Sequence, residues 1–463
     1  MKLKNKLYDP SLFTLTDSSG TMNLFSLSVP LFFQQIFTFL LGTVNTVVLT
    51  RVSGDAVTAV NVAVSVLSIP IILLTMPSNG AVIILSLTLG SNARKRLGDI
   101  YVTGLIINII LPILLSIIFF FSAPALLGIM NVSGSILEES IVYFKIRCLF
   151  LIFQALTTYL TGVLRAYGMA KSTMISGIIV NVINALLSIM TVSGLFLSGN
   201  KIIGVSAAAG IGQLAGMLYA FLILYKNRQI SVRGSFIRSA AIRILKVGVP
   251  SGLSLFAYNV SSMLITSMIA SLGNQVMNTK VFVTNIASYT YLFGYAMAQS
   301  SALMTGRLCG AKKYDRAKAL FRQNIRFIPM INVCMSFIAF LFSNQLMRIF
   351  TDDVAIIHTA HYLFLADIAV EAFRGITHMG ENSLCSVEDT LYTSIVSIAS
   401  CFLISVLFCR LFCIHFKMGL FGYYISAMMD EGIRGLMYRI RWNKGKWVDR
   451  CNIYGKCTVP LSL

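Results

Sequence analysis

Long apolar runs, separated by short polar loops, cover most of the chain. A membrane-spanning helix needs about 20 predominantly apolar residues, and twelve runs are long enough. Spans are predicted near residues 24–49, 56–89, 101–122, 141–165, 172–193, 202–225, 245–271, 276–305, 325–347, 358–384, 391–413 and 418–440. The second run contains Pro70 and Pro77 but no polar turn, so the prolines are expected to bend one long helix. The predicted fold class is an all-α polytopic membrane protein.

One apolar run carries charged side chains at a regular spacing. The stretch "HYLFLADIAVEAFRGITHMG" (361–380) contains Asp367, Glu371, Arg374 and His378 at steps of 4, 3 and 4. On an α-helix these steps place all four side chains on one face. Glu371 falls near the middle of the predicted span, where a charge costs several kcal/mol, so this face is expected to point into the helix bundle.

The last predicted span holds a second charged group at a similar depth. Asp430 and Arg434 are spaced as an i,i+4 pair, with Glu431 beside them, and Glu371 and Arg374 form an i,i+3 pair. Two interpretations stay open. Either the pairs clamp two helices together, or one carboxylate exchanges its arginine for a cation during a transport cycle.

Glu371 is the leading candidate for an ion-responsive carboxylate. Desolvation favours its protonated form and Arg374 favours its ionised form, so it would titrate when the pair opens. The candidate ion-coupling residues are Asp367, Glu371, Asp430 and Glu431, and their charge partners are Arg374 and Arg434. His378 is interpreted as a hydrogen-bonded packing residue rather than a proton relay.

Further polar side chains within the apolar runs are candidates for a substrate cavity. They are Gln34, Asn45, Asn61 and Gln154 in the first half and Asn259, Asn285, Tyr289 and Gln299 in the second half. For each of them, a hydrogen bond between helices is the alternative role.

Composition and charge agree with a membrane protein. Charged residues make up 12% of the chain, against about 25% in soluble proteins. The net charge is +20. When successive spans alternate in direction, six basic residues fall in the loops on one side of the membrane, and about four times as many fall in the loops on the other side and in the two tails. The positive-inside rule therefore predicts a plasma (inner) membrane protein with both termini cytoplasmic. The basic character is attributed to this topology and not to nucleic-acid binding.

Several other classes find no support in the sequence. The nine cysteines lack zinc-type paired spacing, and no Walker-type GxxxxGK[ST] motif occurs. No cluster of His with Asp, or of Ser with Lys, lies at a predicted membrane face. We therefore predict no metal site, no cofactor, no enzymatic activity and no ATP coupling. The polar first 20 residues predict no cleavable signal peptide.

The two halves of the chain repeat at an offset of 220 positions. "SVP" (28–30) then matches "GVP" (248–250), and "LGSNARK" (89–95) matches "CGAKKYD" (309–315). Six spans is an even number, so both lobes share one orientation and are related by a pseudo-two-fold axis along the membrane normal. This architecture suits a secondary transporter in which two lobes rock around a central cavity.

The domain organisation follows from the spans and from the basic stretch between them. We expect a cytoplasmic N-terminal segment, a first lobe of six helices, a basic cytoplasmic linker, a second lobe of six helices and a basic cytoplasmic tail. The predicted ranges are 1–23, 24–225, 226–247, 248–440 and 441–463.

Motifs in both halves carry a resemblance to a known family. They are "SVPLFFQQIFTFLLGTVNTVVLTRVSGDAVTAVNVA" (28–63), "LGSNARKRLGD" (89–99), "GVLRAYGMAKSTMISGIIVNVINALLSIMTVSG" (162–194) and "QSSALMTGRLCGAKKYDRAKALF" (299–321). Together with the two-by-six layout they resemble the MATE (multidrug and toxic compound extrusion) family over nearly the whole chain. The ending "DEGIRGLMYRIRWNKGKW" (430–447) is similar to that of a less-studied bacterial branch.

The resemblance implies a monomeric antiporter that exports amphipathic, cationic organic compounds in exchange for H⁺ or Na⁺ by alternating access. It also adds Asn181 and Asn184, from the family's Asn-rich fifth helix, to the cavity candidates. Asn45 and Ser188 stand where the family often carries Asp, so the first lobe lacks an obvious intramembrane carboxylate. Asn45 can still bind a cation through its carbonyl oxygen but cannot release a proton. Ion coupling is therefore expected in the second lobe.

A lipid-linked saccharide flippase of the same superfamily is the alternative function. A flippase is expected to place several Arg or Lys in the cavity to bind a pyrophosphate. Here the intramembrane cations are few and each has an acid nearby, which favours the exporter. The expected partners are a small organic substrate and the lipid bilayer.

Overall fold

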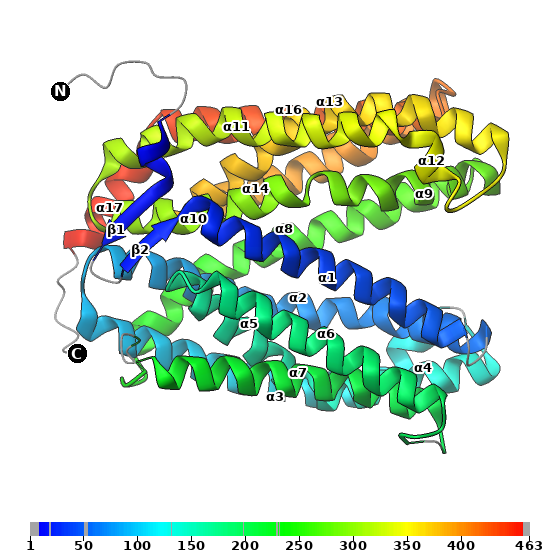
Figure 1. Cartoon of the computed structure of the whole chain (residues 1–463), viewed down its shortest axis with the longest axis horizontal. Helices are drawn as coiled ribbons and strands as arrows, with labels where there is room; N and C mark the ends of the chain where they lie inside the picture. Colours follow the sequence, from blue (N-terminus) through cyan, green and yellow to red (C-terminus); the bar gives the residue numbers. More distant parts are fainter. Residues whose placement is uncertain are drawn as a thin grey trace. The chain divides into compact units, whose positions relative to one another are not determined.

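The computed structural model describes residues 9–17, 20–50, 54–130, 132–197, 199–227, 230 and 232–456, and almost all of them are helical (Figure 1). The helices are α1 (Leu24–Thr50), α2 (Gly54–Gly90), α3 (Arg94–Gly128), α4 (Gly134–Leu149), α5 (Leu151–Ala166), α6 (Ala170–Val192), α7 (Lys201–Lys226), α8 (Arg238–Ala270), α9 (Asn274–Thr290), α10 (Leu292–Gly310), α11 (Tyr314–Leu341), α12 (Ser343–Met347), α13 (Val354–Ser386), α14 (Thr390–Ser400), α15 (Leu407–Cys409), α16 (Leu420–Asn443) and α17 (Lys446–Lys456). Two π-helical segments, Cys401–Val406 and Arg410–His415, flank α15.

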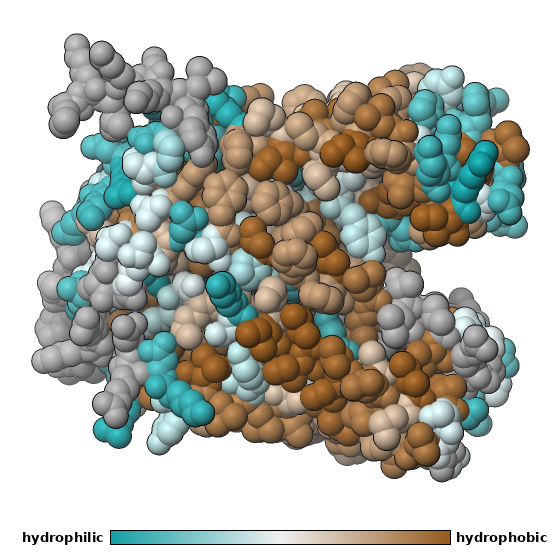
Figure 2. Space-filling view, viewed as in Figure 1, coloured by the Kyte–Doolittle hydropathy of each residue, from teal (hydrophilic) through white to brown (hydrophobic). Residues whose placement is uncertain are grey.

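The helices confirm the predicted all-α, multi-span class. In the described part of the chain, nine helices are long and apolar enough to cross a membrane, and α4 with α5, bent by 49°, adds a tenth. The predicted span 276–305 falls on α9 and α10, and the predicted span 418–440 falls on α16. As predicted, α2 is one helix of 37 residues that contains Pro70 and Pro77. Figure 2 shows apolar side chains over the middle of the helices and polar side chains near their ends.

The described residues divide into two compact units, each with its own core. One unit falls within Met1–Val29, Ser86–Asn92 and Leu253–Leu463, and the other within Pro30–Leu85 and Ala93–Gly252. The core of the first includes Ile269, Val283, Leu363 and Phe364, and that of the second includes Leu67, Leu127, Phe144 and Ile202. Between membrane helices such side chains stabilise the fold by close packing more than by release of water.

A short β-hairpin precedes α1 and was not predicted. The 3₁₀ turn Pro10–Phe13 leads into strand β1 (Thr14–Asp17), which pairs antiparallel with β2 (Gly20–Asn23). The ring of Phe13 lies 5.4 Å from that of Phe25 and 6.0 Å from that of Phe327, centroid to centroid. Strands of four residues are too short to give a clear alternation of apolar and polar positions. The predicted segment 1–23 therefore contains structure that its polar composition concealed.

The repeat offset of 220 reappears in the loop geometry. Positive φ angles occur at Asn92, Gly168 and Leu197, and again 220 positions later at Lys312, Glu388 and Lys417. Residues other than glycine seldom adopt positive φ, so three coincidences at one offset indicate that the two halves share the same turns.

Helices α2 and α10 cross at two glycines that are also 220 positions apart. Gly90 packs against the backbone carbonyl of Arg307, and Gly310 packs against the backbone carbonyl of Leu87. A Cβ atom at either glycine would overlap the facing carbonyl oxygen. The close approach of these two helices therefore requires glycine at both positions.

We expect Gly310→Ala to destabilise the protein by about 1–3 kcal/mol, because the added methyl must push the two backbones apart. The melting temperature of purified protein in detergent measures the effect. Gly128→Ala is the matched control, since open space surrounds Gly128 at the end of α3. Equal melting temperatures for the two variants would contradict the requirement for glycine at the crossing.

Candidate functional site

The predicted polar face, with Asp367, Glu371, Arg374 and His378, lies on α13. Asp353 begins this helix by accepting hydrogen bonds from the amides of Ala355 and Ile356, and the helix then continues unbroken for 33 residues. It packs against α10, α11 and α16, which bury its polar face. Asp367 and Glu371 are 2% and 0% exposed, respectively.

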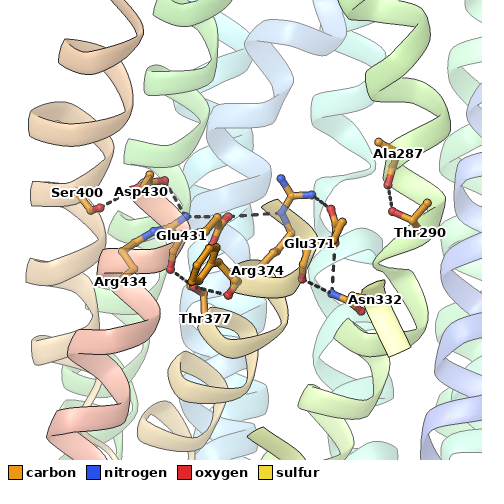
Figure 3. A network of polar contacts seen from close by, with 11 residues as sticks. Ala287, Thr290, Asn332, Glu371, Arg374, Thr377, Ser400, Asp430, Glu431 and Arg434 are labelled. Atoms are coloured by element: carbon orange, nitrogen blue, oxygen red, sulfur yellow. Dashed lines mark hydrogen bonds and ion pairs between the residues drawn. The ribbon is translucent and has the colours of Figure 1, made fainter. Parts of the chain in front are cut away.

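Two arginines connect the acids of α13 and α16 into one network (Figure 3). Arg374 pairs with Glu371, and its Nε lies 3.5 Å from Oε1 of Glu431. Arg434 Nη2 lies 3.0 Å from the same Glu431 oxygen and 2.9 Å from Asp430 Oδ2. Both pairs expected from the sequence spacing are present. Glu431 joins them across the two helices, a contact that spacing within one helix does not reveal.

Neutral side chains of α11 also bind the acids of α13. Asn332 Nδ2 donates to Glu371 Oε2 at 3.3 Å, and Ser336 Oγ donates to Asp367 Oδ2 at 2.9 Å. Asp367 therefore has a hydroxyl partner where Glu371 has both an amide and a guanidinium. These donors were not among the predicted site residues.

A further donor comes from α14, where the helical geometry changes. Ser400 donates to Asp430, and the π-helical segment begins at the next residue, Cys401. The carbonyl oxygen of Cys401 accepts a hydrogen bond from Ser261 of α8 at 3.2 Å. Because π-helical turns often occur at functional sites, the widened turn beside Asp430 adds weight to this location.

Aromatic rings at the break between α9 and α10 cover the cationic side of the network. The guanidinium of Arg374 lies 5.0 Å from the ring centre of Tyr291, the residue between the two helices. The His378 ring lies 4.8 Å from Tyr295 and 5.9 Å from Tyr291, and its Nε2 is buried without a hydrogen-bond partner. The ring contacts fit the packing part of the prediction for His378, but among the described residues the expected hydrogen bond is absent at Nε2.

Glu381 extends the polar face of α13 by one further step, and it was not predicted as a site residue from the sequence. It follows His378 by three residues on α13, is half-buried, and interacts electrostatically with Arg434, Glu431 and Asp430. The step of three residues from His378 to Glu381 continues the spacing of the polar face, so the sequence does carry a signal for Glu381. We refer to the following set as the acid–arginine cluster: Asp367, Glu371, Arg374, Glu381, Asp430, Glu431 and Arg434.

The predicted substrate-cavity residues occupy varied surroundings. Asn184 is buried, Gln34, Gln154, Asn181 and Gln299 are half-buried, and Asn61, Asn259, Asn285 and Tyr289 are exposed. Asn184 accepts a hydrogen bond from Ser188 at 3.3 Å, and Gln154 accepts one from Arg147 at 3.1 Å. The side chain of Asn45 lies outside the described residues. A cavity role for these residues stays a prediction.

The structure gives no sign of a metal centre in the part of the chain that it describes. No three His, Cys, Asp or Glu side chains there are placed to hold a metal ion together.

Comparison with known proteins points to one family. The MatE family model matches residues 30–190 and 250–411. The transporter YisQ of Bacillus subtilis (strain 168) is 29% identical over 437 residues, which cover 93% of this chain and 96% of YisQ. The probable multidrug resistance protein NorM of Thermotoga maritima is 21% identical over 433 residues, covering 92% of this chain and 93% of that protein.

Solved structures show the same fold. An outward-facing multidrug resistance MATE family transporter of the MOP superfamily aligns with a TM-score of 0.84 at 18% identity, covering 92% of this chain and 96% of that chain. A MOP superfamily transporter from Pyrococcus furiosus, described by the reverse polarity of its binding pocket, aligns with a TM-score of 0.83 at 18% identity over the same shares.

We expect Arg434→Met to destabilise the protein by about 3–5 kcal/mol, because Asp430 and Glu431 lose a shared counter-charge inside the bundle. Thermal unfolding in detergent is the measurement. Arg439→Met serves as the control, since Arg439 is exposed on the same helix. Similar melting temperatures for both variants would show that the pairing adds little to stability.

Proposed function

Because the chain belongs to the MatE family of multidrug efflux transporters, we propose that it exports amphipathic, cationic organic compounds in exchange for H⁺ or Na⁺ by alternating access. The proposal places the protein in the inner membrane with both termini cytoplasmic. It assigns ion coupling to the acid–arginine cluster, with Glu371 as the ion-responsive carboxylate and with Asp367, Asp430 and Glu431 as further candidates.

The charge balance of the acid–arginine cluster supports this proposal most directly. The cluster holds five carboxylates and two guanidiniums, and four of the carboxylates are less than 10% exposed. If every acid were ionised, three negative charges would be uncompensated, and two would remain even with His378 protonated. Uncompensated buried charge costs several kcal/mol per group. The cluster is therefore expected to take up protons or monovalent cations, which is what a coupling site requires.

The contacts of Glu371 give a physical route from ion binding to movement. Its ionised form holds Arg374 on one side, and Asn332 of α11 donates to it on the other side. Protonation removes the charge that holds Arg374, which then interacts more strongly with Glu431. Such a difference in contacts between two states is the condition for a bound ion to shift a conformational equilibrium.

The charges of the acid–arginine cluster also bear on two alternatives, a static clamp between helices and a lipid-linked saccharide flippase. A static clamp with every acid ionised would leave negative charge uncompensated, whereas reversible binding of a proton or cation balances the excess of carboxylates. A lipid-linked saccharide flippase would need an excess of cations to bind a pyrophosphate, and both arginines of the cluster are already paired with acids. Neither alternative accounts for the charge excess as well as ion coupling does.

We expect Glu371→Gln to fold normally and to reduce gradient-driven flux by about 5- to 150-fold, the factor that corresponds to a coupling free energy of about 1–3 kcal/mol between two sites. Proteoliposomes with an imposed pH or Na⁺ gradient and an amphipathic cationic dye provide the measurement. Glu138→Gln, at an exposed position on α4, is the matched control. Unchanged gradient dependence in Glu371→Gln would leave the cluster as a structural clamp.

We expect Asn45→Ala to lower dye flux while leaving its dependence on the ion gradient intact. The reason is that coupling is assigned to the second half, whereas an amide at residue 45 is assigned to the substrate cavity. Dye flux with and without the ion gradient is measured in proteoliposomes that contain either the Asn45→Ala variant or the unmutated protein. Loss of the gradient dependence in a well-folded variant would move the coupling site to the first half.

A further inference from the structure

The last helix, α17, is fastened to the end of the bundle by aromatic stacking. Trp447 is fully buried, and its ring stacks on Trp442 of α16 with 4.4 Å between centroids. Trp442 in turn stacks on Phe321 of α11 at 4.6 Å, and the Trp447 indole N–H donates to the Trp442 carbonyl oxygen at 3.0 Å. These contacts give α17 a fixed position on α11 and α16.

A buried carboxylate ties the same helix to the turn between α13 and α14. Asp389 has a fully buried side chain, and its Oδ1 lies 2.9 Å from Arg450 Nη1 of α17. Its Oδ2 lies 2.7 Å from Nε of Arg441, which belongs to α16. Charge-assisted hydrogen bonds of this kind are stronger than neutral ones and fix orientation as well as distance.

This docking brings two thiols from distant parts of the sequence together. Cys309 is buried at the end of α10, Cys451 is half-buried on α17, and the two thiols lie near enough to interact with each other. The two helices are in contact, and the ring of Tyr314, at the start of α11, lies 6.0 Å from that of Trp447. We propose that Cys309 and Cys451 form a modification site, a dithiol that a peroxide oxidises to a disulfide linking α17 to α10.

The chemistry is a two-electron oxidation of the pair. The thiolate of Cys451, the more exposed partner, attacks one oxygen of hydrogen peroxide, which gives a sulfenic acid and water. The sulfur of Cys309 then attacks the sulfenic sulfur, the S–S bond forms, and a second water leaves. Two thiols are oxidised and one peroxide is reduced, and a thiol reductant reverses the reaction.

The location of the pair gives the disulfide a mechanical effect. Cys309 directly precedes Gly310, which packs against the Leu87 carbonyl where α10 crosses α2. A bond at Cys309 therefore anchors α17 beside a crossing that tolerates little displacement. On the proposed topology this end faces the cytoplasm, where thiols are normally reduced, so the bond forms under oxidative conditions.

Peptide mapping of the full-length protein tests the proposal. Protein in proteoliposomes is treated with hydrogen peroxide, its free thiols are blocked with N-ethylmaleimide, and it is digested with trypsin. Cleavage after Arg307, Lys312, Arg450 and Lys456 releases the peptides LCGAK and CNIYGK. We expect a linked LCGAK–CNIYGK species, two hydrogens lighter than the sum of the two peptides and lost on reduction. The melting temperature should rise by several degrees in the oxidised protein.

Two variants make the test specific. Cys451→Ser should remove both the linked peptide and the oxidation-dependent rise in melting temperature. Cys334→Ser, at an exposed cysteine on α11, should retain both. The proposal is overturned if LCGAK and CNIYGK stay unlinked at a peroxide dose after which Cys451 no longer reacts with N-ethylmaleimide. Linkage of CNIYGK to a cysteine other than Cys309, or to a second molecule, would overturn it equally.

Discussion

The need to compensate buried negative charge shapes the second half of this chain. A carboxylate removed from water requires a counter-charge, a proton or hydrogen bonds. Helices α13 and α16 supply two guanidiniums, and α11 and α14 supply hydroxyl and amide donors. Four helices are therefore linked through polar contacts around the same acids. In the proposed transport cycle, protonation of one acid changes the polar contacts that link these helices.

Regularities within one helix could be read from the sequence, and contacts between helices could not. The steps from Asp367 to His378 and the two acid–arginine pairs follow from helical geometry alone. The bond from Arg374 to Glu431 depends on how α16 is rotated against α13. Close packing at Gly435 helps to set that rotation: a Cβ there would lie 3.1 Å from Oγ1 of Thr377 and 3.1 Å from Cγ2 of Ile376. A single sequence carries no direct signal for such a fit between two helices.

The two halves keep the same backbone turns but close them with different chemistry. Gly168 and Glu388 both have positive φ at equivalent turns. In the first half the next residue, Met169, accepts a hydrogen bond from the amide of Asn227 through its sulfur at 3.4 Å. In the second half the equivalent residue is Asp389, which holds two arginines. Backbone geometry is thus shared between the two turns, whereas the ion pairs of Asp389 have no counterpart at Met169.

Glu431 accepts from Arg374 and Arg434 through a single oxygen. Arg374 consequently has two carboxylates within reach at once, and the loss of one charge does not strand its guanidinium in an apolar interior. In the proposed cycle, protonation of Glu371 leaves Arg374 paired with Glu431, so this step avoids the full free-energy penalty of an isolated buried cation.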